Sequence, residues 1–178
     1  MPDDRLPGVT FEELALPIFD QLYNFAHWLT QDASEAEDLV QETYAKALRG
    51  FSSFRLGTNF RAWMFRILRN SFLTSRAGLK STVALADDAE ETIASADPTP
   101  EASLIAHADR ESVREALCEL TLPFREILLL CEVEEMSYEE ISQTLSIPMG
   151  TVMSRLSRAR KALRVHLQAK LRGGARGV

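Results

Sequence analysis

The chain has 178 residues, of which 46% are hydrophobic, and this composition excludes a wholly disordered protein. Its apolar runs are short and broken by charge, so none reaches the roughly 20 residues that a membrane-spanning helix needs. The N-terminus has neither the basic start nor the apolar stretch of a secretory signal, so we expect a cytoplasmic protein without membrane insertion. Cys118 and Cys131 lie in apolar helical patterns without a CxxC motif, and the three histidines are scattered. This arrangement predicts reduced core thiols and no metal site or cofactor.

The net charge of −6 conceals a segregation of charge along the chain. Residues 43–86 contain eight basic residues and no acid, and residues 148–178 contain eight more, again without an acid. All 26 acidic residues therefore lie within 1–42 and 87–140. We interpret the two acid-free blocks as two sites that contact a polyanion, with other surfaces left for a different partner.

Apolar residues recur at spacings of three and four, and no period-two alternation is sustained, which predicts an all-α protein. The first helix is expected at about 11–29, with one apolar stripe formed by Leu14, Ile18, Leu22, Phe25 and Leu29. The second is expected to begin near Ser34, whose hydroxyl can cap it, and to stop at Gly50. After a loop at 51–58, a third helix is expected at about 59–76.

Residues 79–103 are small, acidic and closed by two prolines, which predicts a flexible acidic linker. Four helical segments follow, at about 104–120, 123–132, 138–145 and 149–171. The chain is therefore predicted to form two small helical domains, 1–78 and 104–178. Each is near the lower size limit for an independent core, but domains of this size do fold alone.

The clearest local pattern is a helix-turn-helix between Ser137 and Leu163. Ser137 and Glu140 predict a capping box for the first helix, and Pro148 is expected at the first position of the second. The second helix has an apolar face of Val152, Leu156, Ala159 and Leu163, and an opposite face of Thr151, Ser154, Arg158 and Lys161 with Arg155 alongside. Such a helix can lie in the major groove, where arginine bonds guanine and other cations meet phosphate. The alternative is a surface helix with solvated arginines, although surface helices usually interleave acids.

A second pattern interleaves aromatic and basic residues between 51 and 72. Unpaired bases stack on aromatic rings while arginines hold the backbone, so this composition suits single-stranded or opened DNA. The competing interpretation is a protein core, since one helical stripe takes in Phe60, Trp63, Met64, Ile67 and Leu68. On a helical wheel of this segment, Phe65, Arg66 and Arg69 lie on the side away from the apolar stripe. The stripe also does not include the loop residues Phe54 and Arg55 or Asn59, so a core role does not explain them.

The third pattern is a polar helical face at 35–43, where Asp38, Gln41 and Glu42 are close together. Together with His27, such carboxylates could serve acid–base or metal chemistry. Charges of this kind are ordinary near a helix start, however, so we favour solvent or a protein partner.

Four segments together resemble bacterial extracytoplasmic-function sigma factors, the small group IV initiation factors of RNA polymerase. They are DLVQETYAKA at 38–47, FRLGTNFRAWMFRILRN at 54–70, MSYEEISQTLSIP at 136–148 and MGTVMSRLSRAR at 149–160. The resemblance runs from about Phe11 to Arg172. It is to the minimal form of the family, in which a linker replaces domain 3 and neither an N-terminal inhibitory region nor an extra C-terminal domain is expected.

The resemblance implies a role for each set of residues. Asp38, Gln41 and Glu42 would dock on the beta-prime clamp helices of core RNA polymerase. Opening and reading of the minus-10 element of promoter DNA would fall on Phe54, Arg55, Asn59, Arg66, Arg69, Asn70 and Arg76. The second domain would sit on the beta flap and present Thr151, Ser154, Arg155, Arg158 and Lys161 to the minus-35 element. The linker would thread towards the RNA path, and an anti-sigma factor would restrain the protein until a stress signal arrives.

Two other classes remain open on the sequence alone. An ordinary helix-turn-helix repressor or activator would need an N-terminal lobe that senses a ligand or dimerises, and no ligand pocket is obvious in the aromatic and basic lobe. A metal-dependent helical hydrolase would need a nucleophile–base pair, metal-ligand spacing or a glycine-rich phosphate loop, and none is visible.

Overall fold

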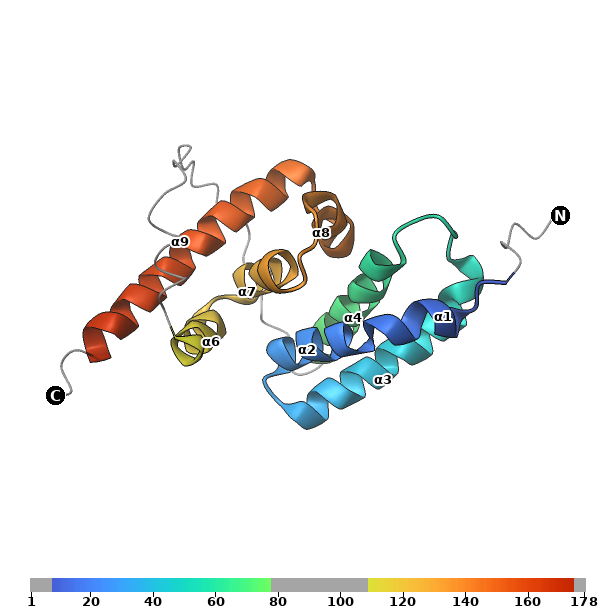
Figure 1. Cartoon of the computed structure of the whole chain (residues 1–178), viewed down its shortest axis with the longest axis horizontal. Coiled ribbons are helices and arrows are strands. Elements are labelled where there is room, and N and C mark those ends of the chain that lie inside the picture. Colours follow the sequence, from blue (N-terminus) through green and yellow to red (C-terminus); the bar gives the residue numbers. More distant parts are fainter. Residues whose placement is uncertain (1–7, 78–108, 175–178) are drawn as a thin grey trace. The chain divides into compact units, whose positions relative to one another are not determined.

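The computed structural model describes residues 8–77 and 109–174, and every regular element in these ranges is helical (Figure 1). In chain order the elements are α1 (Phe11–Ala15), η1 (Leu16–Ile18), α2 (Phe19–Thr30), α3 (Ala33–Gly50), η2 (Phe51–Ser53), α4 (Phe60–Ala77), α6 (Arg110–Glu119), α7 (Leu122–Leu128), η3 (Leu129–Val133), α8 (Tyr138–Leu145) and α9 (Met149–Gly174). The all-α prediction is confirmed. None of the helices in the described ranges has the length and apolar character needed to span a membrane.

Contacts between Cα atoms group the described residues into two compact units. The first unit holds residues 8–77 together with 139–147, and the second holds 109–138 together with 148–174. The predicted linker at 79–103 and both of its boundaries lie outside the described residues, as does the start of the helix predicted from 104.

Helices α2, α3 and α4 pack on one another and supply the core of the first unit. Leu22 and Phe25 of α2 are buried, and the Phe25 ring lies 5.3 Å from the ring of Phe65 on α4. The prediction of one continuous helix at 11–29 is wrong in one respect, because the 3-10 turn η1 separates α1 from α2. Pro17 lies in that turn and has no N–H to donate to a continuous helix.

Side-chain caps fix where the helices of the first unit begin. The carboxylate of Asp32 accepts a hydrogen bond from the Glu35 N–H at 2.8 Å, so Asp32 caps α3 and the predicted Ser34 cap is wrong. The side-chain oxygen of Asn59 accepts from the Ala62 N–H at 2.9 Å and caps α4. Gly50 does not stop α3 by a left-handed turn, because its φ is −88° and the chain continues into η2.

Tyr44 fastens α3 to the end of α1, since its hydroxyl donates to the Ala15 carbonyl at 2.6 Å. Burial raises the pKa of Tyr44 from 10.0 to about 12. The folded state therefore holds the phenolic proton more tightly than the unfolded chain does, and the stability linked to this proton is complete below pH 10. It is lost as the pH rises through about 12.

Tyr44→Phe is expected to lower the free energy of unfolding by about 1 kcal/mol at pH 7, because one hydrogen bond is lost. Between pH 10 and 11.5 the native chain should lose stability more steeply than the variant, which has no phenolic proton at this position. Urea unfolding followed by circular dichroism at several pH values measures both effects. Parallel pH profiles for the two chains would contradict the assignment.

Helices α6 and α7 pack against α9 in the second unit. The predicted apolar face of α9 is confirmed, since its four residues are all buried: Val152, Leu156, Ala159 and Leu163. The helix predicted at 123–132 is α7 followed by the π-helical turn η3, in which the Glu134 N–H bonds the Leu129 carbonyl at 3.0 Å. Cys118 and Cys131 are free thiols, each half-buried, and burial raises the pKa of Cys131.

Arg125 closes the C-terminal end of α6 from within α7. Its guanidinium donates to the backbone carbonyls of Leu117, Cys118 and Leu120 at 3.0, 2.8 and 3.1 Å. These carbonyls belong to the end of a helix, where the backbone lacks intrahelical donors. Burial lowers the pKa of Arg125, but its ordinary value is so high that the side chain stays charged.

Candidate nucleic-acid interface

The turn between α8 and α9 is built from backbone and side-chain hydrogen bonds. Ser146 takes a left-handed conformation with φ 55°, and the Ile147 N–H bonds the Ser142 carbonyl at 3.2 Å. The Ser142 hydroxyl donates back to the Ile147 carbonyl at 2.5 Å. The Pro148 carbonyl accepts the Val152 N–H at 3.0 Å, so Pro148 is the cap of α9, which begins at Met149. The prediction that Pro148 is the first helical residue is therefore wrong by one position. The tight turn defines where the basic helix α9 begins.

The five residues predicted to face the minus-35 element all lie off the buried stripe of α9. Ser154 is exposed, and the other four are half-buried: Thr151, Arg155, Arg158 and Lys161. The same side of the helix also exposes Gly150, Met153 and Ser157. Because α9 contains no acid, this face is cationic along its N-terminal half.

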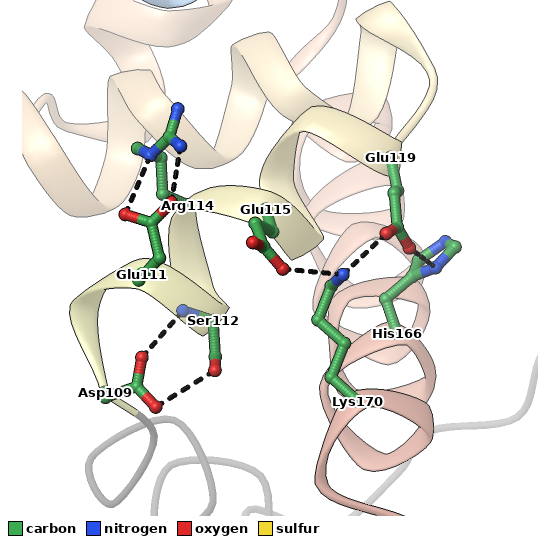
Figure 2. A network of polar contacts seen from close by, with 8 residues as sticks. All are labelled: Asp109, Glu111, Ser112, Arg114, Glu115, Glu119, His166 and Lys170. Carbon is green, nitrogen blue, oxygen red and sulfur yellow. Dashed lines mark hydrogen bonds and ion pairs between the residues drawn. The ribbon is translucent and has the colours of Figure 1, made fainter. Parts of the chain in front are cut away.

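Three other side chains of the second basic block are engaged by acids within the same unit. Arg160 contacts the Glu132 carboxylate at 2.7 Å. Figure 2 shows Lys170 and His166 of α9 reaching α6, where Lys170 lies 2.7 Å from a Glu119 oxygen and His166 2.9 Å from the other. Lys170 also contacts Glu115 at 2.9 Å.

This contact network divides α9 into two parts. The hydrogen bond from Lys170 lowers the pKa of Glu119, and the Glu119 carboxylate raises the pKa of Lys170 in return. Asp109 caps the start of α6 in a separate contact, in which its side chain accepts from the Ser112 N–H at 2.8 Å (Figure 2). The C-terminal half of α9 is thus held to α6, and its N-terminal half carries the cationic face.

A hollow beside α4 brings together four of the seven residues predicted to contact the minus-10 element. Its lining comes from η2, from the loop at 54–59 and from the first two turns of α4, and includes Ser53, Phe54, Arg55, Thr58, Asn59, Ala62, Trp63 and Arg66. The Phe54 and Trp63 rings are 4.8 Å apart and tilted by 40°. Thr58 donates its hydroxyl to the Arg55 carbonyl at 2.7 Å, which shapes the loop. The hollow combines aromatic faces with cations and polar side chains.

The other three predicted minus-10 residues lie along α4 outside this hollow. Arg69 is half-buried, and Asn70 is exposed one turn beyond Arg66. Arg76 contacts the Glu35 carboxylate at 2.8 Å, and its guanidinium lies 5.2 Å from the centre of the Phe72 ring. The charge of Arg76 is therefore balanced within the protein.

Two aromatic residues of α4 take the opposite places from those predicted by the helical wheel. Phe65 is fully buried against Phe25, whereas Trp63 is half-exposed and lines the hollow. The reason is that α4 packs against both α2 and α3, so its buried stripe centres on Phe65, Leu68 and Phe72. Trp63 follows Asn59 by four residues and precedes Arg66 by three, and residues at these spacings share one face of a helix. This spacing is the sequence signal that places Trp63 on the polar side of α4.

The polar face of α3 is exposed as predicted. Asp38, Gln41 and Glu42 are all exposed, whereas their neighbours Leu39 and Val40 are buried. Glu42 contacts Lys46 at 2.6 Å. Within the described ranges, no group of three or more His, Cys, Asp or Glu side chains could hold a metal ion.

Comparisons with known proteins match both units of the chain. The family model for Sigma-70 region 2 matches residues 19–82, and the model for Sigma-70 region 4 matches residues 110–163. The ECF RNA polymerase sigma factor SigE of Mycolicibacterium smegmatis is 37% identical over 168 residues, which is 92% of this chain and 64% of that protein. The chain thus spans less than two thirds of that relative's length.

Two further relatives are matched over most of their length. The ECF RNA polymerase sigma factor EcfG of Rhodopseudomonas palustris is 37% identical over 78% of this chain and 75% of its own. SigL of Mycobacterium tuberculosis, another ECF sigma factor, is 32% identical over 92% of this chain and 96% of its own.

Solved structures agree with the relatives. The sigma factor RpoE from Bartonella quintana, solved in complex with the anti-sigma factor NepR, matches with a TM-score of 0.69 and 32% identity over 89% of this chain and 96% of that one. CnrH, solved with the cytosolic domain of CnrY, shares the fold with a TM-score of 0.65 at 24% identity, over 89% of this chain and 88% of its own. The chain belongs to the extracytoplasmic-function RNA polymerase sigma factors.

Proposed function

We propose that the chain binds core RNA polymerase and directs initiation at promoters, with α9 recognising the minus-35 element and the hollow beside α4 recognising the minus-10 element. The observation that carries this proposal is the presence of two chemically different cationic faces. One is a helix face suited to duplex DNA, and the other pairs cations with half-exposed aromatic rings. In this role the protein is a transcription factor of the cytoplasm and not an enzyme.

The hollow beside α4 suits a base that has left the duplex. Phe54 and Trp63 offer ring faces for stacking, while the exposed guanidinium groups of Arg55 and Arg66 can meet phosphates. Extruding a base costs stacking and pairing energy, which the new stacking contact offsets. We assign the minus-10 role to these four residues and Asn59, with Arg69 and Asn70 extending the surface along α4.

The exposed polar face of α3 is proposed to contact the beta-prime clamp helices of the polymerase. The second unit would contact the beta flap, and residues 79–103 would connect the two DNA-reading regions. An anti-sigma factor is proposed as the inhibitor, because the matched sigma factor RpoE was solved in complex with the anti-sigma factor NepR.

Combining Asp38→Ala with Gln41→Ala is expected to weaken binding to core polymerase by at least tenfold while leaving the fold intact, because both side chains are exposed. The matched control combines Asp20→Ala with Asn24→Ala, which removes the same two groups from exposed positions on α2. Affinity is measured by titrating labelled chain with core polymerase, and folding by circular dichroism. Native affinity in the α3 variant would remove Asp38 and Gln41 from the interface.

An ordinary helix-turn-helix repressor is distinguished by its independence from polymerase. The proposal predicts that promoter binding by this chain requires core polymerase, whereas a repressor binds its operator alone. Mobility-shift titrations with and without core polymerase separate the two functions.

A further inference from the structure

Met153 stands out on the cationic face of α9. It is 52% exposed, although it is a large apolar residue near the start of a helix whose own apolar stripe is buried. Three of its exposed neighbours have small side chains or none, namely Gly150, Ser154 and Ser157, and a fourth is Met149 at the first position of the helix, which is 41% exposed. Small neighbours let the helix backbone approach a groove closely, so the long side chain of Met153 would reach furthest towards the base edges.

We propose that Met153 is a specificity residue that recognises thymine, by packing its thioether end against the C5-methyl group of a thymine in the duplex bound by α9. The proposal rests on the proposed function of α9. In the major groove every base edge presents hydrogen-bond donors or acceptors, and only thymine adds an apolar methyl group. Methionine has no donor and only a weak acceptor, so it gains from the methyl and leaves other edges without a partner.

Duplex DNA fits this face better than a protein surface does. Arg155, Arg158 and Lys161 lie within eight positions of Met153 on the same helix, and no acid occurs between residues 148 and 178. An exposed methionine on a helix without acids suits a polyanion that carries methyl groups. The side chain is also flexible enough to adjust to the position of a methyl group.

The test compares two duplex libraries in which the minus-35 window is randomised, one made with thymine and one with uracil, which lacks only the C5-methyl. Each is selected with the holoenzyme formed from the full chain and core polymerase. The native chain should enrich thymine at one position by about three- to fourfold, the effect of burying one methyl group. In the uracil library this preference should disappear while the other enriched positions remain.

Variants of the same helix complete the test. Met153→Gln keeps the length of the side chain but not its apolar end and should lose the thymine preference, whereas Met153→Leu should retain it. Val165→Ala is the matched control, since Val165 is 61% exposed on the C-terminal half of α9, and it should change no preference. Circular dichroism confirms that each variant folds.

Each contrary result has its own meaning. Equal preferences in the two libraries, or an unchanged thymine preference in Met153→Gln, would overturn the proposal while leaving α9 as the minus-35 reader. Weaker binding of Met153→Gln to core polymerase with unchanged base preferences would place Met153 in a protein interface and also overturn it. No enriched minus-35 position for the native chain in either library would overturn the proposed function of α9 itself.

Discussion

Phe65→Ala is expected to lower the free energy of unfolding of the first unit by about 3–5 kcal/mol, the usual cost of emptying a large aromatic site. Phe65 has no exposed surface, packs 5.3 Å from the Phe25 ring and lies under the Arg61 guanidinium at 5.7 Å. The measurement is urea unfolding of the full chain followed by circular dichroism.

Trp63→Ala is the matched variant on the same helix. Trp63 is half-exposed, so its removal should cost roughly 2 kcal/mol, scaled to its smaller buried area. The variant should instead be defective in opening duplex promoters, because one wall of the hollow beside α4 is lost. A larger loss of stability for Trp63→Ala than for Phe65→Ala would contradict the packing described for α4.

Arg158→Ala is expected to spare folding and to weaken recognition of the minus-35 element. If Arg158 bonds guanine, the loss should be about 1–3 kcal/mol and confined to promoters that carry this base. If it contacts phosphate, all sequences should weaken alike and the salt slope should fall by about one. Arg172→Ala serves as the control, since Arg172 is an exposed arginine at the far end of the same helix.

Open-complex formation on duplex and pre-melted templates separates the two DNA sites. Arg158→Ala should be defective on duplex templates, whereas opening at minus-10 should survive on templates that are already melted, because we assign that step to the hollow beside α4 in our proposal. An equal defect on both templates would show that Arg158 does not act through minus-35 recognition.

Local patterns were enough to predict most of the helices and the face of α9. The spacing of apolar residues placed the helix at Tyr138–Leu145 and the buried stripe from Val152 to Leu163, because each pattern depends on residues within a few turns. The start of α3 was misplaced by two residues, because Asp32 and Ser34 are both good caps and the sequence does not choose between them.

What depends on tertiary contacts could not be predicted from the sequence. Lys170 and Arg160 look like the other cations of the second basic block, but their carboxylate partners lie on other elements, in Glu115, Glu119 and Glu132. The predicted burial of Trp63 and Phe65 was the reverse of what the structure shows. A helical wheel of α4 does not show that α2 and α3 cover this helix from different sides. The candidate sites were found from composition, and packing decides which of their members face outwards.

Run-off transcription with purified core polymerase, this chain and the DNA upstream of its own operon is the most direct test of the proposed role in promoter-specific initiation. We expect a discrete transcript that requires the chain and is lost or strongly reduced both in the Asp38→Ala, Gln41→Ala variant and in Arg158→Ala. Binding of the chain to that DNA without polymerase, with no chain-dependent transcript from it, would contradict this role.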